Sequence, residues 1–382
     1  MQKVAQSWLV LTLTGSPLLL GLDAFLGELP ILLFTLLGGV IADRHDRRYV
    51  LIGSQFVQMA SALTLAALVL SDTWADGELN GDVLEIWHIL SLSFLSGCGQ
   101  AFGGPAYQSL IPSLVPKDNL PNAIALNSIQ FNLARVIGPL LAGVTLATLG
   151  TAACFIINGL SFFVVIVALL SLKVQHTPPK VKKDIFEEML SGLSYVRQRK
   201  AMVPLIFLAA ATTFLGLPLL TLLPILVQNV FLQGVVQYSE LMAYSGTGAV
   251  IGALLIAWFG KFKHMGSTLL RVQTVFGLLI IGFAVSRTLW LSQALLFVSG
   301  AALIIVFSLV TSLVQLIAPN EMRGRVMSIF MLAFRGGAPL GNLLGGYLAG
   351  IISAPTVLVM NGCLLATIAC YFLIKSHGIR EL

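Results

Sequence analysis

Charged residues are scarce in this chain. Asp, Glu, Lys and Arg together make up 10% of its 382 residues, whereas they make up about a quarter of an ordinary soluble domain. Hydrophobic residues account for 57% of the sequence, and the mean hydropathy is +0.93. This balance excludes a soluble globular protein and predicts one that crosses the membrane several times.

Cysteines and catalytic motifs are also few. The four cysteines, Cys98, Cys154, Cys363 and Cys370, lie in apolar stretches without the spacing of a metal site. The sequence contains no P-loop, zinc-binding motif or nucleophile elbow. These absences argue against an ATP-driven pump and an intramembrane hydrolase. We therefore predict a protein that is not an enzyme and that holds neither a metal nor a cofactor.

Long apolar runs, by contrast, are abundant. A helix needs roughly 20 apolar residues to cross the hydrocarbon core, and lipid accepts only helices or closed barrels. The alternating pattern of barrel strands is absent, so we expect an all-α polytopic membrane protein. Eleven runs are predicted to be spans: 17–41, 49–70, 87–112, 123–148, 151–172, 201–228, 239–260, 267–286, 288–316, 326–351 and 354–374.

A shorter apolar run, "MQKVAQSWLVLTLTG", occupies residues 1–15. At 1.5 Å per residue it is too short to cross about 30 Å of hydrocarbon. We expect it to be the second half of a first span, truncated at the N-terminus, with roughly 15 to 20 residues encoded upstream. This span would bring the total to twelve. A cleavable signal peptide is the alternative, but the run holds one basic residue, Lys3, and no suitable cleavage site.

The basic residues predict the orientation. Most Lys and Arg residues fall in loops on one side of the predicted spans, and basic residues in short loops stay in the cytoplasm. We therefore expect both chain ends to lie in the cytoplasm. The net charge of +6 is then a signal of topology, and it implies no nucleic-acid partner.

One stretch, 173–200, has the composition of a cytoplasmic linker, with a Pro pair and a short amphipathic pattern at 185–193. It divides the chain into an N-terminal transmembrane bundle, 1–172, and a C-terminal transmembrane bundle, 201–382. The halves resemble each other, because an Arg-x-x-x-Pro pattern occurs at Arg135 and again at Arg335. Such an offset is typical of transporters built from two parallel repeats.

A charged cluster, "GGVIADRHDRRYVL", occupies residues 38–51. It resembles the loop between the second and third helices of the major facilitator superfamily, whose pattern is Gly-x-Leu-Ala-Asp-Arg-x-Gly-Arg-Arg-x-x-Leu. Ile41 stands for the Leu, and Asp46 replaces the second Gly. The matching residues are Gly39, Ala42, Asp43, Arg44, Arg47, Arg48 and Leu51.

Three other stretches, at 4–17, 101–128 and 318–328, are similar to the branch of this superfamily that contains the enterobactin exporter and related drug and macrolide efflux proteins. The Asp at position 46 is typical of the same branch. The resemblance runs from Gln2 to about Tyr371. It implies the major-facilitator fold of two six-helix bundles.

The resemblance also implies a gating motif, made of Gly39, Asp43, Arg44, Arg47 and Arg48. A carboxylate at the negative C-terminal end of a helix needs a positive group facing it. By family resemblance, Asp43 meets the helix that begins near Arg325 and closes the cytoplasmic side. A plain positive-inside anchor is the alternative, although it explains the arginines and not Asp43 or Gly39.

Charges inside predicted spans are costly and mark candidate functional sites. Two of them, Asp23 and Glu28, stand five positions apart, so they cannot share one helix face. A desolvated carboxylate that faces a cavity can carry a proton, whereas a merely interfacial position is the alternative. We predict that these acids, together with Arg135 and Arg335, couple substrate to proton.

Arg135 stays protonated and needs a carboxylate, carbonyl or substrate partner. With Gly138, Pro139 and Gly143 it resembles the Gly-Pro motif of helix five in exporters of this superfamily, although the full glycine ladder is missing. Small residues permit close helix contact, and Pro139 permits a bend. A structural role is the alternative for Arg135, and it is the better fit for Arg335.

Together these features predict a secondary transporter that exports a small amphiphilic molecule, a siderophore or a drug, across the bacterial cytoplasmic membrane in exchange for protons. The expected partners are the small-molecule substrate, the proton and the lipid bilayer. Two alternatives stay open. One is a facilitator or lipid flippase without ion coupling, and the other is a polytopic enzyme or assembly factor.

Overall fold

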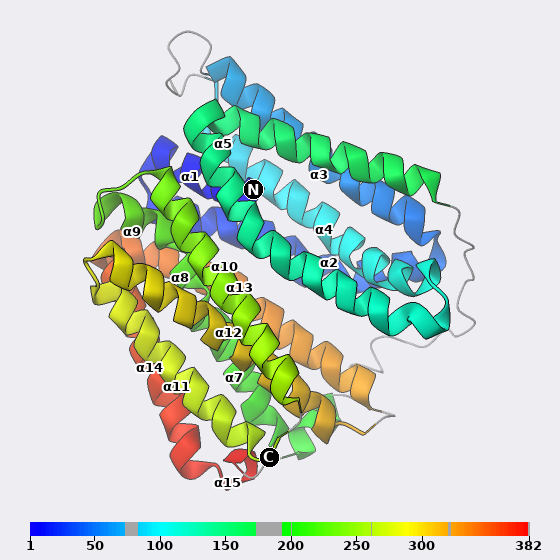
Figure 1. Cartoon of the computed structure of the whole chain (residues 1–382), viewed down its shortest axis with the longest axis vertical. Coiled ribbons are helices and arrows are strands. Elements are labelled where there is room, and N and C mark those ends of the chain that lie inside the picture. Colours follow the sequence, from blue (N-terminus) through cyan, green and yellow to red (C-terminus); the bar gives the residue numbers. More distant parts are fainter. Residues whose placement is uncertain (73–82, 173–192, 200, 261, 320–321, 381–382) are drawn as a thin grey trace. The chain divides into compact units, whose positions relative to one another are not determined.

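The computed structural model describes residues 1–72, 83–172, 193–199, 201–260, 262–319 and 322–380, without the side chains of Asp43, Lys117, Pro121 and His377. These residues form helices and no strand (Figure 1), which confirms the predicted all-α fold. Most of the predicted linker at 173–200, and with it the amphipathic pattern at 185–193, falls outside the described residues.

The chain divides into two compact units, Met1–Val181 with Gln233–Glu240, and Lys182–Leu232 with Leu241–Leu382. The helices of the first unit are α1 (Gln2–Thr14), α2 (Pro17–Arg44), α3 (Arg47–Asp72), α4 (Ile86–Leu114), η1 (Lys117–Asn119) and α5 (Leu120–Ser171). Those of the second are α7 (Met202–Gly216), α8 (Pro218–Thr221), α9 (Leu223–Asn229), α11 (Met265–Val285), α12 (Leu289–Ile317), α13 (Arg323–Ile352), α14 (Ala354–Lys375) and α15 (His377–Arg380). The first residues of α10 (Val235–Phe259) cluster with the first unit and the rest with the second.

Eight helices of the described part are long and apolar enough to cross a membrane. Two of the predicted spans, 123–148 and 151–172, are joined in α5, where Gly150 interrupts the helix with a φ of 81°. Glycine adopts this backbone conformation without a steric penalty. The predicted span 201–228 is divided into α7, α8 and α9, because Pro218 and Pro224 begin new helical segments.

Glycines bring α2 and α4 close together in the first unit, where the two helices run side by side (Figure 1). A Cβ atom at Gly38 would overlap the backbone of Ala101, and one at Gly97 would overlap the backbone of Gly27. Small residues of this kind let helix backbones approach in a membrane. This packing places the polar side chains of α2 and α4 within reach of each other.

Glycines also allow close helix contact in the second unit, between α7 and α13. Gly337 and Gly341 stand one turn apart on α13, and a Cβ atom at either would overlap the α7 backbone at Ala210 or Phe214. A large apolar core surrounds this contact, and Phe330 and Leu205 within it are completely buried. The second unit is therefore held together by close apolar packing.

Candidate transport site

A buried polar cluster joins three helices of the first unit. It consists of Gln6 on α1, Asp23 on α2 and Ser93 on α4, whose exposed fractions are 8%, 7% and 5%. The Gln6 side-chain amide donates a hydrogen bond of 2.7 Å to Oδ1 of Asp23 and also contacts the Ser93 hydroxyl. The Ser93 hydroxyl donates to the same Oδ1 atom. We call these three residues the Asp23 cluster.

The two oxygens of Asp23 differ in their surroundings. Oδ1 accepts hydrogen bonds from both Gln6 and Ser93, whereas no described residue donates to Oδ2. The Ser93 hydroxyl also lies 2.9 Å from the carbonyl oxygen of Ile89, so its single proton has two possible acceptors. Among the described residues, hydrogen bonds therefore reach this buried carboxyl group through Oδ1 alone.

Glu28 has a different partner from Asp23. Its Oε1 atom lies 2.5 Å from Nζ of Lys3 on α1, and the two side chains are 31% and 84% exposed. This is the one salt bridge between residues that the structure describes. Glu28 is thus neutralised by a neighbouring cation, whereas Asp23 is held by neutral donors.

Arg135 and Arg335 both project from their helices as exposed side chains. The Arg135 guanidinium lies 4.9 Å from the centre of the Phe131 ring. Among described residues, neither arginine has a hydrogen bond or an ion pair, so Arg135 does not pair with Asp23 or Glu28. Neither guanidinium group is therefore neutralised by a described carboxylate.

The residues of the predicted helix-five motif lie at helix contacts. Pro139 is buried within α5. A Cβ atom at Gly138 would lie 3.6 Å from the backbone nitrogen of Met1, and one at Gly143 would overlap Ser239 in the 233–240 segment of the same unit. These small residues therefore allow close approach to α5.

In the predicted gating motif, two arginines bind backbone carbonyls. Arg47 donates to the carbonyl of Ser109 on α4 over 2.9 Å, and Arg48 donates to the carbonyl of Leu172, the C-terminal cap of α5. Cations are favourable near the carbonyl ends of helices. Arg47 and Arg48 therefore tie the start of α3 to α4 and α5.

The other members of the motif make fewer contacts. Arg44 is exposed, and a Cβ atom at Gly39 would meet nothing within 4 Å. Asp46 accepts a hydrogen bond of 2.9 Å from the backbone nitrogen of Arg48, so it caps the start of α3. Its presence in place of the family's glycine therefore has a local reason. The side chain of Asp43 lies outside the described residues.

The prediction of site residues from charges inside spans missed the neutral members of this site. Gln6 and Ser93 are polar residues inside apolar runs, and a neutral polar side chain in a span also needs a partner. Gln2 is another neutral polar residue with a partner on a different helix, because it accepts a hydrogen bond of 2.6 Å from Asn158 on α5. One charged residue, Glu240, was also absent from the predicted site residues; it is a half-buried acid in the second turn of α10.

Residues 1–379 match the family of transmembrane secretion effectors, MFS_3. The chain belongs to this family, within the major facilitator superfamily. It is similar to macrolide efflux protein A of Streptococcus pyogenes, with 25% identity over 366 residues that cover 93% of this chain and 87% of that protein. It is also similar to the enterobactin exporter EntS of Citrobacter koseri, with 26% identity over 343 residues that cover 89% and 76%.

A solved structure supports the fold. The nucleoside transporter NupG has a TM-score of 0.72 and 16% identity, over 98% of this chain and 94% of the other. These comparisons confirm the predicted superfamily and the major-facilitator fold. They also show a multi-pass bacterial membrane protein that acts in export and is not an enzyme.

Proposed function

We propose that this transporter exports a small amphiphilic molecule across the bacterial cytoplasmic membrane in exchange for protons, with Asp23 as the proton carrier. The observation that supports this most is the Asp23 cluster, in which one buried oxygen has two donors and the other has none from described residues. Buried acids in membrane helices are rare outside proton and substrate pathways. Both chain ends lie in the cytoplasm, in accord with the distribution of Lys and Arg.

The proposed exchange begins with Asp23 ionised. Its charge strengthens the hydrogen bonds from Gln6 and Ser93, and these bonds hold α1, α2 and α4 together. Protonation at Oδ2 removes the charge, so the Ser93 hydroxyl turns to the carbonyl of Ile89. The three helices are then held less tightly, and a proton gradient can shift the transporter toward its other conformation.

Arg135 and Arg335 are the proposed substrate contacts. Each is exposed and lacks a carboxylate partner among described residues, and Phe131 adds an aromatic face beside Arg135. A cation next to an aromatic ring suits an amphiphile with a polar or anionic group. The names of the relatives, a macrolide efflux protein and an enterobactin exporter, support a drug or a siderophore as substrate.

The gating motif is proposed to close the cytoplasmic side. Arg47 and Arg48 hold the first unit's helices at this end through backbone carbonyls. In the proposed closed state, Asp43 meets the helix that begins near Arg325. Asp43→Asn should then abolish export without reducing membrane insertion. Normal export by this variant would favour the plain anchor.

Transport into inside-out membrane vesicles tests the proposal. Uptake of a labelled macrolide, and in parallel of a catecholate siderophore, should require an imposed proton gradient and stop when an uncoupler is added. Asp23→Asn should stop gradient-driven uptake while exchange of substrate across the membrane continues. Glu240→Gln removes an acid from a span end and serves as the control. Uptake that persists with the uncoupler would instead support a facilitator.

A further inference from the structure

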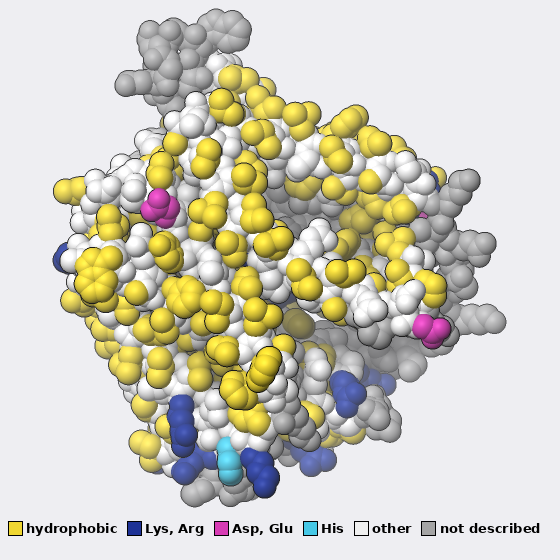
Figure 2. Space-filling view, viewed as in Figure 1, with side chains coloured by type: hydrophobic (Ala, Val, Ile, Leu, Met, Phe, Trp, Pro, Cys, Tyr) yellow, Lys and Arg dark blue, Asp and Glu magenta, His cyan; other side chains and the backbone are white. Residues whose placement is uncertain are grey.

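The part of the second unit that follows residue 240 is strongly basic. Residues 241–382 contain nine Lys and Arg residues but only two acids, Glu321 and Glu381, and neither acid belongs to the described residues. On the face shown in Figure 2, Lys and Arg side chains gather at one edge, near the position of α15 in Figure 1. We call this the basic end. Six described cations belong to it by sequence: Lys263, Arg271, Arg323, Arg325, Lys375 and Arg380.

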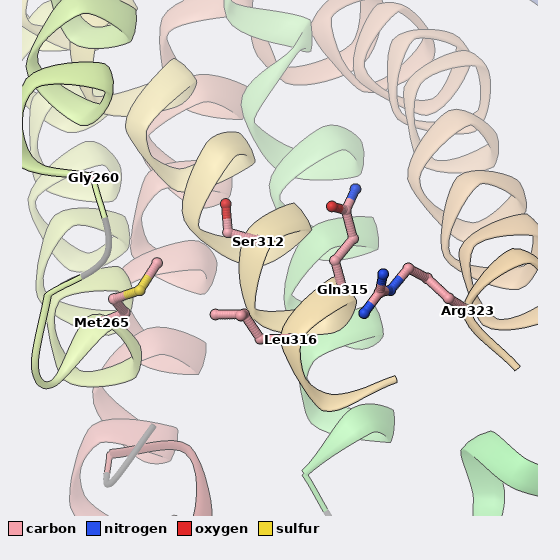
Figure 3. Close-up of a pocket in the computed structure, with 6 residues that line it drawn as sticks. All are labelled: Gly260, Met265, Ser312, Gln315, Leu316 and Arg323. Carbon is pink, nitrogen blue, oxygen red and sulfur yellow. The ribbon is translucent and has the colours of Figure 1, made fainter. Parts of the chain in front are cut away.

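A pocket of about 340 Å³ lies at the basic end, between four helices of the second unit. Figure 3 shows Ser312 and Leu316 of α12 on the side that faces Gly260 and Met265, whereas Gln315 lies on the side of Arg323, whose guanidinium extends toward α12. Gly260 follows the last residue of α10, and Met265 and Arg323 begin α11 and α13. The pocket is therefore built from helix ends and carries its cation on one wall.

The lining is amphipathic, and its cation has no fixed partner among the residues that the structure describes. Arg323 is exposed, and no hydrogen bond or ion pair joins it to another described residue. Ser312 and Gln315 supply a hydroxyl and an amide, and Met265 and Leu316 supply apolar walls. A guanidinium beside neutral donors matches a phosphate group. The apolar walls match a ligand whose anionic group is attached to a hydrocarbon body.

Aromatic residues place the pocket at the level of lipid head groups. Trp258 and Phe259 in the last turn of α10 are 88% and 64% exposed, and they directly precede Gly260 of the pocket. Exposed aromatic side chains at the ends of membrane helices lie at the interface between head groups and water. The head group of a lipid can therefore enter the pocket while its acyl chains stay in the bilayer. A free phosphate ester would have to enter from the aqueous phase.

We propose that this pocket binds the phosphate head group of an acidic phospholipid, with Arg323 paired to the phosphate and Ser312 and Gln315 donating hydrogen bonds. The inference rests on the proposed orientation, in which the basic end is cytoplasmic, and acidic lipids are abundant in the cytoplasmic leaflet. The lipid would fix the ends of α10, α12 and α13 at the membrane surface.

Lipid retention by the full chain tests the site. The protein is placed in nanodiscs with equal amounts of phosphatidylglycerol and phosphatidylcholine, and the lipids that stay bound on release are counted by native mass spectrometry. The wild type should retain phosphatidylglycerol in preference by about fivefold, the ratio expected for one cation near the lipid surface. Arg323→Gln should bring the ratio to near parity, and Arg323→Lys should keep most of the preference.

Arg287→Gln is the matched control, because Arg287 is an exposed cation at the opposite end of α11. It should retain lipid as the wild type does. An unchanged preference in Arg323→Gln would overturn the proposal. So would loss of the preference in both Arg287→Gln and Arg323→Gln, since the effect would then reflect total charge.

A second arm distinguishes the source of the phosphate. Excess inorganic phosphate should leave the preference for phosphatidylglycerol in place. If phosphate alone removes that preference and raises the melting temperature in phosphatidylcholine, the ligand is a free anion and the lipid assignment is wrong. Melting in pure phosphatidylcholine checks the fold of each variant. Transport is not measured, so failure of the proton-coupling proposal would leave this result unaffected.

Discussion

The first unit encloses Asp23 with two donors on one of its oxygens, whereas the described residues of the second unit include no Asp or Glu. The buried polar side chains of the second unit, such as Thr212, Gln273 and Asn342, are neutral. Both units nevertheless contain an Arg-x-x-x-Pro pattern and close glycine contacts. Among the described residues, the two units thus share close glycine packing, while a buried carboxylate occurs in the first unit and not in the second.

The largest effect on stability should come from disturbing a close glycine contact, for which the second unit offers a matched pair of positions. Gly341→Val would place a branched side chain against the backbone of Phe214, which cannot move aside as a flexible side chain can. We expect a loss of about 3 kcal/mol in stability, seen as a lower melting temperature and a smaller yield of folded protein. Gly350→Val on the same helix is the control, because a Cβ there meets nothing within 4 Å. Equal melting temperatures for the two variants would contradict the packing account.

In the first unit, the largest effect short of removing the acid should come from Gln6→Leu. This variant removes the donor that lies 2.7 Å from Asp23, and one hydrogen bond to a charged group corresponds to about tenfold in rate. Gradient-driven export should fall by about that factor and stay sensitive to the uncoupler. Gln2→Leu, one turn earlier on α1, should export almost normally. Similar losses in both variants would show that α1 needs its polar contacts for stability alone.

A smaller effect is expected where Arg47 ties α3 to α4. Arg47→Gln removes the guanidinium that binds the carbonyl of Ser109, and we expect a loss of about 1.5 kcal/mol in stability. Arg44→Gln removes an exposed cation from the same motif and should melt as the wild type does. Thermal unfolding in detergent compares the two. A larger loss in Arg44→Gln would show that the carbonyl contacts do not anchor α3.

The smallest effect should come from Glu28→Gln. Its partner Lys3 is 84% exposed, and exposed salt bridges contribute about 0 to 1 kcal/mol. Gradient-driven export should therefore stay within about threefold of the wild type. A loss of coupling as complete as that of Asp23→Asn would instead make Glu28 a proton carrier.

Helices were the most predictable part of this protein. An apolar run that is bounded by charge and lacks the alternating pattern of a barrel strand forms a helix in lipid, so α2, α3, α4, α10, α11, α12, α13 and α14 follow from the sequence. The interruption of 201–228 was missed, because a proline in an apolar run can bend a helix or begin a new one. Only packing decides between these outcomes.

The site was less predictable than the helices. Asp23 stands out as a charge in a span, but its partners lie 17 and 70 residues away along the chain and are neutral. No local pattern connects them, because the close packing of α2 against α4 creates the contact. Likewise, the carbonyls bound by Arg47 and Arg48 belong to α4 and to the end of α5, and their positions depend on how the helices end.

The claim that Asp23 carries the proton can be tested most directly by measuring protons. Purified protein is reconstituted in liposomes with a pH-sensitive dye in the lumen, and a macrolide gradient is imposed without any initial proton gradient. In the wild type, protons should move against the direction of the macrolide, and Glu240→Gln should behave in the same way. Asp23→Asn should move no protons while it still exchanges labelled for unlabelled macrolide. Proton movement by Asp23→Asn at the wild-type rate would contradict the account.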